Sequence, residues 1–282
     1  MKRYVIIPTT TVLILLTAFG YLSLYKADDL RSPLDRPRPG QKLSFTLITG
    51  SNSPFFFPGL KNLVGSVHKW SPDRDIVVWD LGLSPEQVAE VKTWCRVTYR
   101  KFDFDKYPPH LRNLHTYAWK PVIVKEMVDT YERVLWIDAG SHINDSMSTM
   151  DQLMWEDGYI LIQGQDADTT LFLHEKMCLH LGLKKTSFKN KPSFAGGFNG
   201  WSNRPYLYQK LLIPWFTCAL TQRCIAPEGA SLANHRFDQS ALTVISYSSG
   251  LDLKPHTELN RIEKESRNGN KMYLDRVRKK PC

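Results

Sequence analysis

Strand-like and helix-like apolar patterns alternate along residues 43–140, and this alternation restricts the possible folds more than any other feature of the chain. Runs rich in Val, Ile, Leu and Trp, as at 43–50, 75–83 and 133–140, predict strands. Helical spacing separates them, and residues 84–87 form a capping box at one helix start. The pattern predicts an α/β unit with a mostly parallel sheet and flanking helices.

After residue 140 the pattern is looser, which suggests that this second half of the domain is a substrate-binding half built on loops. Residues 194–203 combine three glycines with three aromatic residues and are expected to form a turn region. The other expected elements are a strand at 158–165, helices at 170–183 and 204–220 with a break at Pro214, and a helix from 238 onward.

The stretch Tyr4–Tyr25 has no charged residue and is long enough to cross a bilayer as a helix. Lys2 and Arg3 precede it, which favours a cytoplasmic N-terminus and a lumenal or extracellular remainder. The alternative is a cleaved signal peptide ending near Gly20. We therefore expect a single-pass type II protein of the Golgi or ER membrane. The expected parts are a tail at 1–3, an anchor at 4–25, a stem at 26–42, a lumenal domain at 43–260 and a basic tail at 261–282.

The formal net charge is +9, and residues 261–282 carry eight Lys/Arg against three acids. Such a segment is ordinarily a solvated end of the chain. The alternative is attraction to phosphates or an acidic glycan, which would make the protein a basic membrane-anchored adaptor. A secretory N-terminus argues against nucleic-acid binding.

The chain has five cysteines, and none of their spacings is typical of a zinc site. Cys218 and Cys224 are close enough for a small disulfide loop in an oxidising compartment. The odd count leaves a cysteine without an intramolecular partner, and Cys282 is the expected one. Asn144 begins an Asn-Asp-Ser glycosylation sequon.

Asp138 follows the strongly apolar strand at 133–137, at the edge where α/β sheets bind their ligands. It could be only a turn residue, or it could ligate Mg²⁺ or Mn²⁺ beside a diphosphate. Gly140 stands where an Asp-x-Asp motif would have its second carboxylate. Two complete triplets at 103–105 and 166–168 follow less apolar strands and are weaker candidates.

Lys120 and the segment 235–239 are further candidates for a site. Lys120 is either an exposed helical lysine or a cation that neutralises a diphosphate. Asp238 is either a helix N-cap or a group that orients a substrate. The glycines at 194–203 permit close backbone approach to a sugar, although they also suit a tight loop over the core. His256 is either structural or a ligand.

The segments "LSFTLITG", "VVWDLGL", "YAWKP", "VLWIDAG", "CALTQRCIAP" and "HRFDQSAL" occur in this order. Together they resemble a group of animal type II membrane proteins that look like GT-A-fold glycosyltransferases, over residues 43–256. More distantly, "RVLWIDAG" and "DQSAL" resemble the Asp-x-Asp and Asp-Gln motifs of glycogenin-like transferases. The resemblance implies that Asp138 and His256 take the places of metal ligands and that 194–200 faces the sugar.

The sequence thus predicts a GT-A-like glycosyltransferase that moves a sugar from a nucleotide sugar, with UDP-sugar favoured, to a glycan or glycoprotein. Mn²⁺ or Mg²⁺ is the expected cofactor, although Gly140 leaves metal independence open. The alternative is a non-catalytic GT-A-like protein that binds a glycan or a partner. The expected catalytic residues are Asp238 and Gln239, and the expected donor-binding residues are Thr49, Asp80, Lys120, Asp138, Gly140, Gly196, Gly197 and Asn199.

Overall fold

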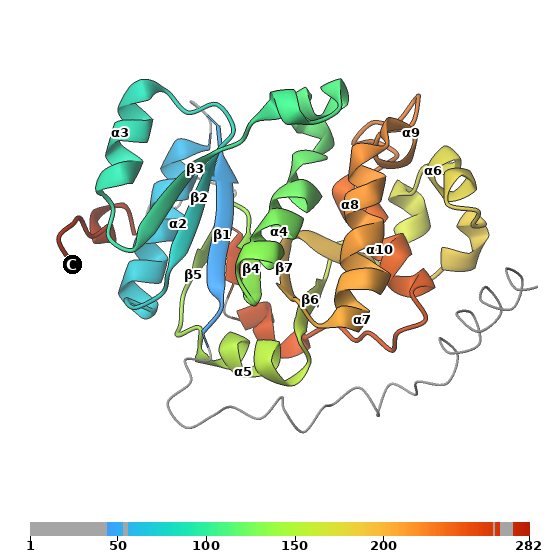
Figure 1. The fold of residues 1–282 in the computed structure, drawn as a ribbon. Coiled ribbons are helices and arrows are strands. Elements are labelled where there is room, and N and C mark those ends of the chain that lie inside the picture. The colour runs from blue at the N-terminus through green and yellow to red at the C-terminus, as the bar shows by residue number, and fades with distance from the viewer. Residues whose placement is uncertain (1–43, 53–55, 262, 266–272) are drawn as a thin grey trace, which may run out of the picture. The chain divides into compact units, whose positions relative to one another are not determined.

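A six-stranded sheet lies at the centre of the folded unit, with strands in the order β3-β2-β1-β4-β7-β6 (Figure 1). The computed structural model describes residues 44–52, 56–261, 263–265 and 273–282, which belong to the unit Leu43–Cys282. The strands are β1 Thr46–Ser51, β2 Ile76–Asp80, β3 Val97–Lys101, β4 Arg133–Ile137, β6 Tyr159–Gln163 and β7 Phe194–Ser202. A small antiparallel sheet pairs β5 (Ser141–Ile143) with β8 (Glu263–Glu265).

Strands β1 to β4 are mutually parallel, and β7 runs antiparallel to both of its neighbours, β4 and β6. Five of the six strands therefore share one direction. This confirms the predicted mostly parallel α/β sheet. The carboxyl ends of β1, β2 and β4 meet at one edge, where ligands bind in sheets of this kind.

Two hydrophobic cores cover the two faces of the sheet, because successive side chains of a strand point in opposite directions. Leu135 and Ile137 belong to one core, and Val134 and Trp136 belong to the other. The first core includes α2 (Phe57–Trp70), α3 (Pro85–Thr93) and α5 (Ser148–Glu156). The second includes α4 (Trp119–Thr130), α6 (Glu175–His180), α7 (Pro205–Leu207), α8 (Ile213–Leu220), α9 (Gln222–Ile225) and α10 (Asp238–Ser248).

The predicted start of α3 is confirmed in detail. Ser84 Oγ accepts a hydrogen bond from the Gln87 backbone N–H, and Gln87 Oε1 accepts one from the Ser84 N–H. Pro85 occupies the first turn, where no N–H partner is needed.

Residues 194–202 form strand β7, so the prediction of a glycine-rich turn was wrong. Glycine is a poor strand former, but each glycine here allows a close approach that a side chain would block. A Cβ on Gly200 would lie 2.3 Å from Met154 Cε and 2.9 Å from Ile160 Cβ. Packing across the sheet therefore outweighs the intrinsic preference of the segment.

Two predicted helices differ from those observed. Within 170–183, only a 3₁₀ turn (Thr169–Phe172) and the short α6 form, and His174 Nδ1 caps α6 by accepting the Lys176 N–H. Residues 205–220 are helical without the expected break. A π-helical turn at Tyr208–Leu212 leads into α8, and Pro214 stands in the first turn of α8, which tolerates proline.

The last ten residues of the expected basic tail are attached to the folded unit, although most of their side chains are exposed. Tyr273 is 4% exposed, and its carbonyl lies so near α2 that a Cβ on Gly65 would come within 1.9 Å of it. Lys279 forms a β-bridge with Trp94, and the Cys95 N–H donates to the Arg278 carbonyl.

Two disulfides are present, Cys218–Cys224 and Cys95–Cys282. The first is the predicted loop, whereas the expectation that Cys282 lacks a partner was wrong. Cys178 is the free cysteine among the described residues, and it is buried. Two disulfides suggest that the chain folds in an oxidising compartment.

The expected tail, anchor and stem (1–3, 4–25 and 26–42) lie outside the described residues. No helix in the described part of the chain is both long enough and apolar enough to cross a membrane.

The two disulfides are predicted to differ in their contribution to stability, because they close loops of very different length. Their sequence separations are 187 and 6 residues. Loop-closure entropy gives about 5 kcal/mol for the long loop and about 2 kcal/mol for the short one. Denaturant unfolding should therefore show a larger loss for Cys95→Ala/Cys282→Ala than for Cys218→Ala/Cys224→Ala. The reverse ranking would contradict this.

Candidate functional site

The ammonium group of Lys120 lies between two carboxylates at the carboxyl end of β4. Nζ is 3.0 Å from Asp138 Oδ1 and 3.1 Å from Asp238 Oδ2, and it donates to the Gly196 carbonyl at 3.1 Å. The Lys120 side chain is 3% exposed. The interpretation of Lys120 as an exposed helical lysine was therefore wrong. The ammonium thus donates one hydrogen bond to the Gly196 carbonyl and forms ion pairs with both carboxylates, while Asp238 Oδ2 has no hydrogen-bond partner of good geometry among the described residues. We call Lys120, Asp138 and Asp238 the charged cluster.

Three elements end or begin at the charged cluster. Lys120 is the second residue of α4, and Asp238 is the first residue of α10. Asp138 directly follows β4, and its N–H donates to the Gly197 carbonyl at 2.8 Å. The antiparallel pairing of β7 with β4 therefore fixes Asp138 beside the glycines of β7.

Indole and phenol rings surround the polar groups of the charged cluster. Trp136 Nε1 donates to Asp138 Oδ1 at 2.6 Å, and Trp215 Nε1 donates to the Asp238 backbone carbonyl at 2.9 Å. The ring centroids of Tyr117 and Trp136 lie 5.3 and 5.5 Å from Lys120 Nζ. These ring faces attract the cation, which helps to offset the loss of its hydration.

Glycines at 196 and 197 let β7 pass directly against the two carboxylates. A Cβ on Gly196 would lie 2.9 Å from Asp238 Oδ2, and a Cβ on Gly197 would lie 2.8 Å from Asp138 Oδ2. Asn199 Nδ2 also donates to the Gly196 carbonyl at 2.9 Å, and Asn199 is fully buried. Asn199 thus supports the strand from inside.

Burial and charge act in opposite directions on the groups of the charged cluster. Burial disfavours the Lys120 ammonium, but attraction to Asp138 and then Asp238 raises its pKa above the ordinary value. Burial raises the pKa of Asp238 from 3.8 to about 6, against the attraction of Lys120. Asp138, whose side chain is 42% exposed, attracts the buried ammonium more strongly than Asp238 does. It is also the member of the cluster that a ligand can reach.

Two other predicted donor residues lie at the ends of β1 and β2. Thr49 is fully buried, and its Oγ1 has no hydrogen-bond partner among the described residues. Asp80 Oδ1 accepts the N–H groups of Gly82 and Leu83, and Oδ2 accepts the Tyr99 hydroxyl. Asp80 therefore holds the turn after β2, with both of its oxygens engaged.

Gln239 lies next to the cluster and is half-buried. Its Nε2 donates to Ser193 Oγ at 3.1 Å, and its Cβ would contact a side chain at position 196. The predicted Asp238–Gln239 pair thus flanks Gly196 at the start of α10.

The side chains around Asp138 do not fit the metal centre that the family resemblance implies. Asp138 Oδ1 already accepts hydrogen bonds from Trp136 and Lys120, and Gly140 offers no side-chain ligand. His256 packs on β6, two strands from β4, where its N–H donates to Leu161 O and Nε2 lies 3.1 Å from Asp157 Oδ2. Within the described part of the chain, no group of three or more His, Cys, Asp or Glu could hold a metal ion.

The two Asp-x-Asp triplets have local structural roles. Asp103 and Asp168 each cap a 3₁₀ turn. Asp105 pairs with Arg112, and Asp166 faces Arg236.

The predicted sequon lies between β5 and α5. Asn144 is half-buried there, and its Oδ1 is enclosed without a hydrogen-bond partner among the described residues. Glycosylation of Asn144 stays a prediction.

Sequence reasoning missed the contributions of Tyr117, Trp136 and Trp215. For Trp136 a signal was present, because residues two apart in a strand share a face, which places its indole beside Asp138. Tyr117 and Trp215 come from distant segments, and nothing local indicates their contacts.

A model of the family described as "Protein of unknown function (DUF1647)" matches residues 39–125. Among curated proteins, none matches this chain.

The fold is distantly similar to those of several glycosyltransferases. The bifunctional glycosyltransferase WbbM shares 9% identity with a TM-score of 0.49, covering 76% of this chain and 39% of its own. Galactosyltransferase LgtC, solved with donor and acceptor sugar analogues, shares 13% identity with a TM-score of 0.39, covering 63% and 66%. Core-mannan synthase A of Aspergillus fumigatus, in an Mn/GDP form, shares 9% identity with a TM-score of 0.45, covering 75% and 71%.

Replacing Lys120 by Met should destabilise the protein by about 3–5 kcal/mol, because two carboxylates are left without their buried counter-ion. Lys125→Met is the matched control. It removes a partly exposed pair with Asp129 in the same helix and should cost less than about 1 kcal/mol. Adding Asp238→Asn to Lys120→Met should recover part of the loss. Equal unfolding free energies for the two single variants would contradict the assignment.

Asp238 should make stability depend on pH. Its pKa is raised in the folded state, so the folded protein binds this proton more readily than the unfolded chain does. The resulting stabilisation is fully present below about pH 3.8 and is lost as the pH rises through about 6. Denaturant unfolding from pH 3.5 to 7 should show the wild type losing stability relative to Asp238→Asn. A stability difference between the wild type and Asp238→Asn that stays constant from pH 3.5 to 7 would contradict this prediction.

Proposed function

We propose that the folded unit binds a nucleotide-diphosphate sugar at the carboxyl edge of β1, β2 and β4 and transfers the sugar to a glycan or glycoprotein acceptor. The observation that carries this proposal is the charged cluster, where the accessible Asp138 carboxylate is fixed by the buried Lys120 ammonium. Burying the Lys120–Asp238 ion pair at a sheet edge costs desolvation energy, so a functional reason for it is expected.

Asp138 acts in this proposal as an oriented hydrogen-bond acceptor for hydroxyl groups of the donor sugar. Trp136 and Lys120 fix one of its oxygens, and the side chain remains 42% exposed. The Lys120 side chain is 3% exposed and its ammonium is paired with both carboxylates, so the proposal gives it no direct contact with the diphosphate. Its role is to position Asp138 and Asp238 and to balance their charge.

The backbone near Gly140 is the proposed place for the diphosphate. A Cβ on Gly140 would meet no atom within 4 Å, so the space beside it is open. The first turn of α2 lies against it, because a Cβ on Gly59 would come within 2.6 Å of the Ala139 carbonyl. Among the described residues no side-chain hydrogen bond caps α2, and the dipole of a helix N-terminus favours an anion.

In the transfer, the bond from the anomeric carbon to the diphosphate oxygen breaks. A bond from that carbon to the acceptor hydroxyl oxygen forms, with release of one proton. The proposed chemistry runs through no metal, because the Lys120 ammonium holds the carboxylates that a metal would need. We place the reaction in the Golgi or ER lumen, behind the anchor proposed at residues 4–25.

A second candidate is a non-catalytic protein that binds a glycan or a partner through the same fold. It is favoured by the low exposure of Asp238, whose side chain is 4% exposed. Donor turnover distinguishes the two candidates.

Nucleotide-sugar binding is tested with the full-length chain in a detergent without a sugar headgroup. In EDTA, one member of a UDP- and GDP-sugar panel is expected to raise the melting temperature and to be hydrolysed. Asp138→Asn should weaken binding at least tenfold, whereas Asp145→Asn, an exposed carboxylate in the next loop, should not. Failure of every donor to bind overturns the proposal, and binding without turnover favours the second candidate.

A further inference from the structure

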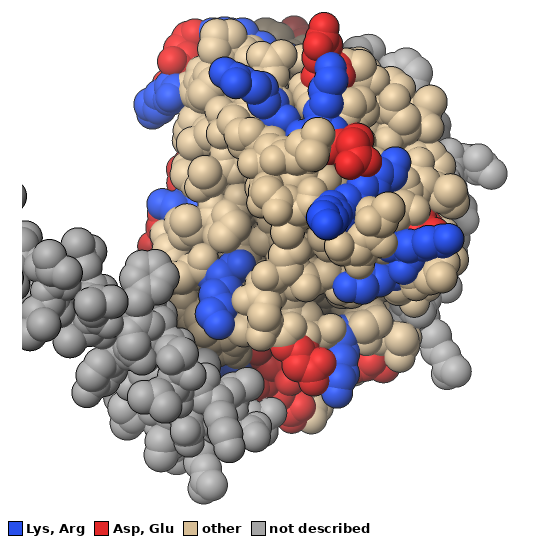
Figure 2. All heavy atoms as spheres, turned by 90° about the vertical axis from the view of Figure 1, so that its right-hand side faces the viewer, with Lys and Arg blue, Asp and Glu red and all other residues tan. Residues whose placement is uncertain are grey.

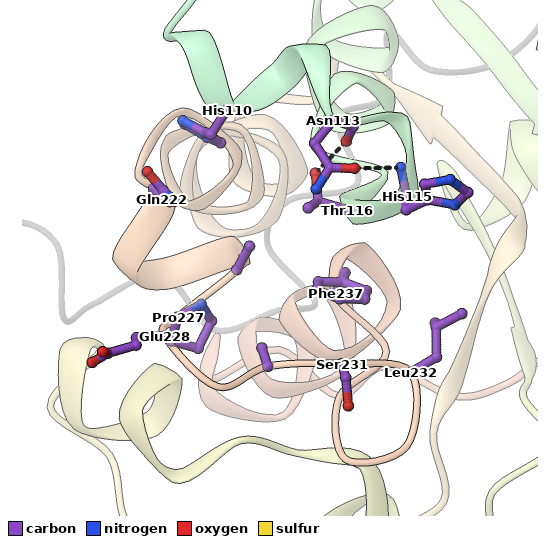
Figure 3. Close-up of a pocket in the computed structure, with 12 residues that line it drawn as sticks. His110, Asn113, His115, Thr116, Gln222, Pro227, Glu228, Ser231, Leu232 and Phe237 are labelled. Carbon is purple, nitrogen blue, oxygen red and sulfur yellow. Dashed lines mark hydrogen bonds between the residues drawn. The ribbon is translucent and has the colours of Figure 1, made fainter.

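A pocket of about 540 Å³ opens next to the charged cluster. Ligand pockets commonly measure about 300–1,000 Å³. One side comes from the two 3₁₀ turns Pro109–Arg112 and Leu114–Thr116, ahead of α4. The other comes from α9 and the loop that follows it, and Phe237 stands between the two sides (Figure 3).

Two residues of the pocket wall directly precede residues of or beside the charged cluster in the chain. Thr116 lines the pocket, and the next residue is Tyr117, whose ring lies 5.3 Å from Lys120 Nζ. Phe237 also lines it, and the next residue is Asp238. Anything bound between Thr116 and Phe237 therefore lies beside the residues that flank the proposed donor site.

Both junction residues have unusual backbone conformations. The φ angles of Tyr117 and Phe237 are 51° and 47°, which is rare for bulky side chains. Such conformations cost free energy and persist where the surrounding structure demands them, often at functional sites. Here they turn the chain between the pocket and the cluster.

The chemistry of the lining suits an uncharged, hydroxyl-rich ligand. No Lys or Arg is among the lining residues, and the one carboxylate, Glu228, is paired with Lys176 at 2.9 Å. Asn113, Gln222 and Ser231 are exposed polar groups at the pocket. The Phe237 ring and the half-exposed Leu232 supply apolar surface, which suits the C–H faces of a sugar.

The charge on the side of the folded unit that carries α6 and α9 gives the same indication. On the α6 and α9 side of the folded unit, Lys and Arg side chains stand apart over a mainly uncharged surface (Figure 2). No continuous basic area is visible in this view, so a sulfated or phosphorylated ligand has little to attract it.

The loop side of the pocket is held in place before any ligand arrives. The disulfide Cys218–Cys224 ties α9 to α8. Asn234 then closes the loop, accepting the Ser231 N–H at Oδ1 and donating from Nδ2 to the Gly229 carbonyl. A preformed wall reduces the entropy lost on binding.

We propose that this pocket binds an uncharged sugar unit of the acceptor glycan and presents it to the donor at Asp138. The proposal rests on the proposed transferase function and adds to it the substrate class, a neutral carbohydrate. It also assigns Phe237 and the loop after α9 to acceptor recognition.

The test uses an array of neutral, sulfated and sialylated glycans with the full-length chain in a detergent without a sugar headgroup. Ala230→Trp fills the pocket, and Leu232→Arg places a charge at its rim. Ala233→Trp, in the same loop but outside the lining, is the matched control. Ala230→Trp and Leu232→Arg should weaken the best neutral glycan at least tenfold, while Ala233→Trp stays within twofold.

Binding of UDP-sugar separates this proposal from the donor site. It should be unchanged in all three variants, with melting temperatures close to wild type. If only acidic glycans bind, or none, the acceptor proposal is overturned while donor binding can stand. Loss of UDP-sugar binding in Ala230→Trp would assign the pocket to the donor and also overturn it.

Discussion

The ion triad formed by the buried Lys120 and Asp238 with the partly exposed Asp138 is the interaction on which the rest of the site depends. An ammonium that is 3% exposed is stable only if every donor has a partner and its charge is balanced. That requirement brings together the start of α4, the end of β4 and the start of α10. It also requires glycine at two positions of β7, where any Cβ would meet a carboxylate oxygen.

A fixed ammonium and a bound divalent metal can each balance the negative charge of neighbouring carboxylates. A metal needs several oxygen ligands and can exchange with solvent, whereas Lys120 is covalently part of the chain. We propose that Lys120 supplies the positive charge that a metal would bring to these carboxylates, and that glycine at position 140 leaves open backbone beside the α2 N-terminus. The departure from Asp-x-Asp and the burial of Lys120 thus have one explanation.

Local patterns were enough to predict much of the fold. The alternation of strands and helices, the Ser84 cap and the position of Asp138 after β4 all follow from short-range rules. Strand β7 was missed because its glycines are set by contacts with Met154, Asp138 and Asp238. The Cys95–Cys282 disulfide and the three-way pairing of Lys120 join distant segments, and no spacing in the sequence indicates them.

The most direct test of this account is a crystal structure of the protein grown with UDP and Mn²⁺, with anomalous data collected at the manganese edge. We expect Lys120 Nζ to lie within hydrogen-bond distance of Asp138 and Asp238, with no manganese peak on Asp138. A manganese ion ligated by Asp138, with the Lys120 side chain turned away from both carboxylates, would contradict it.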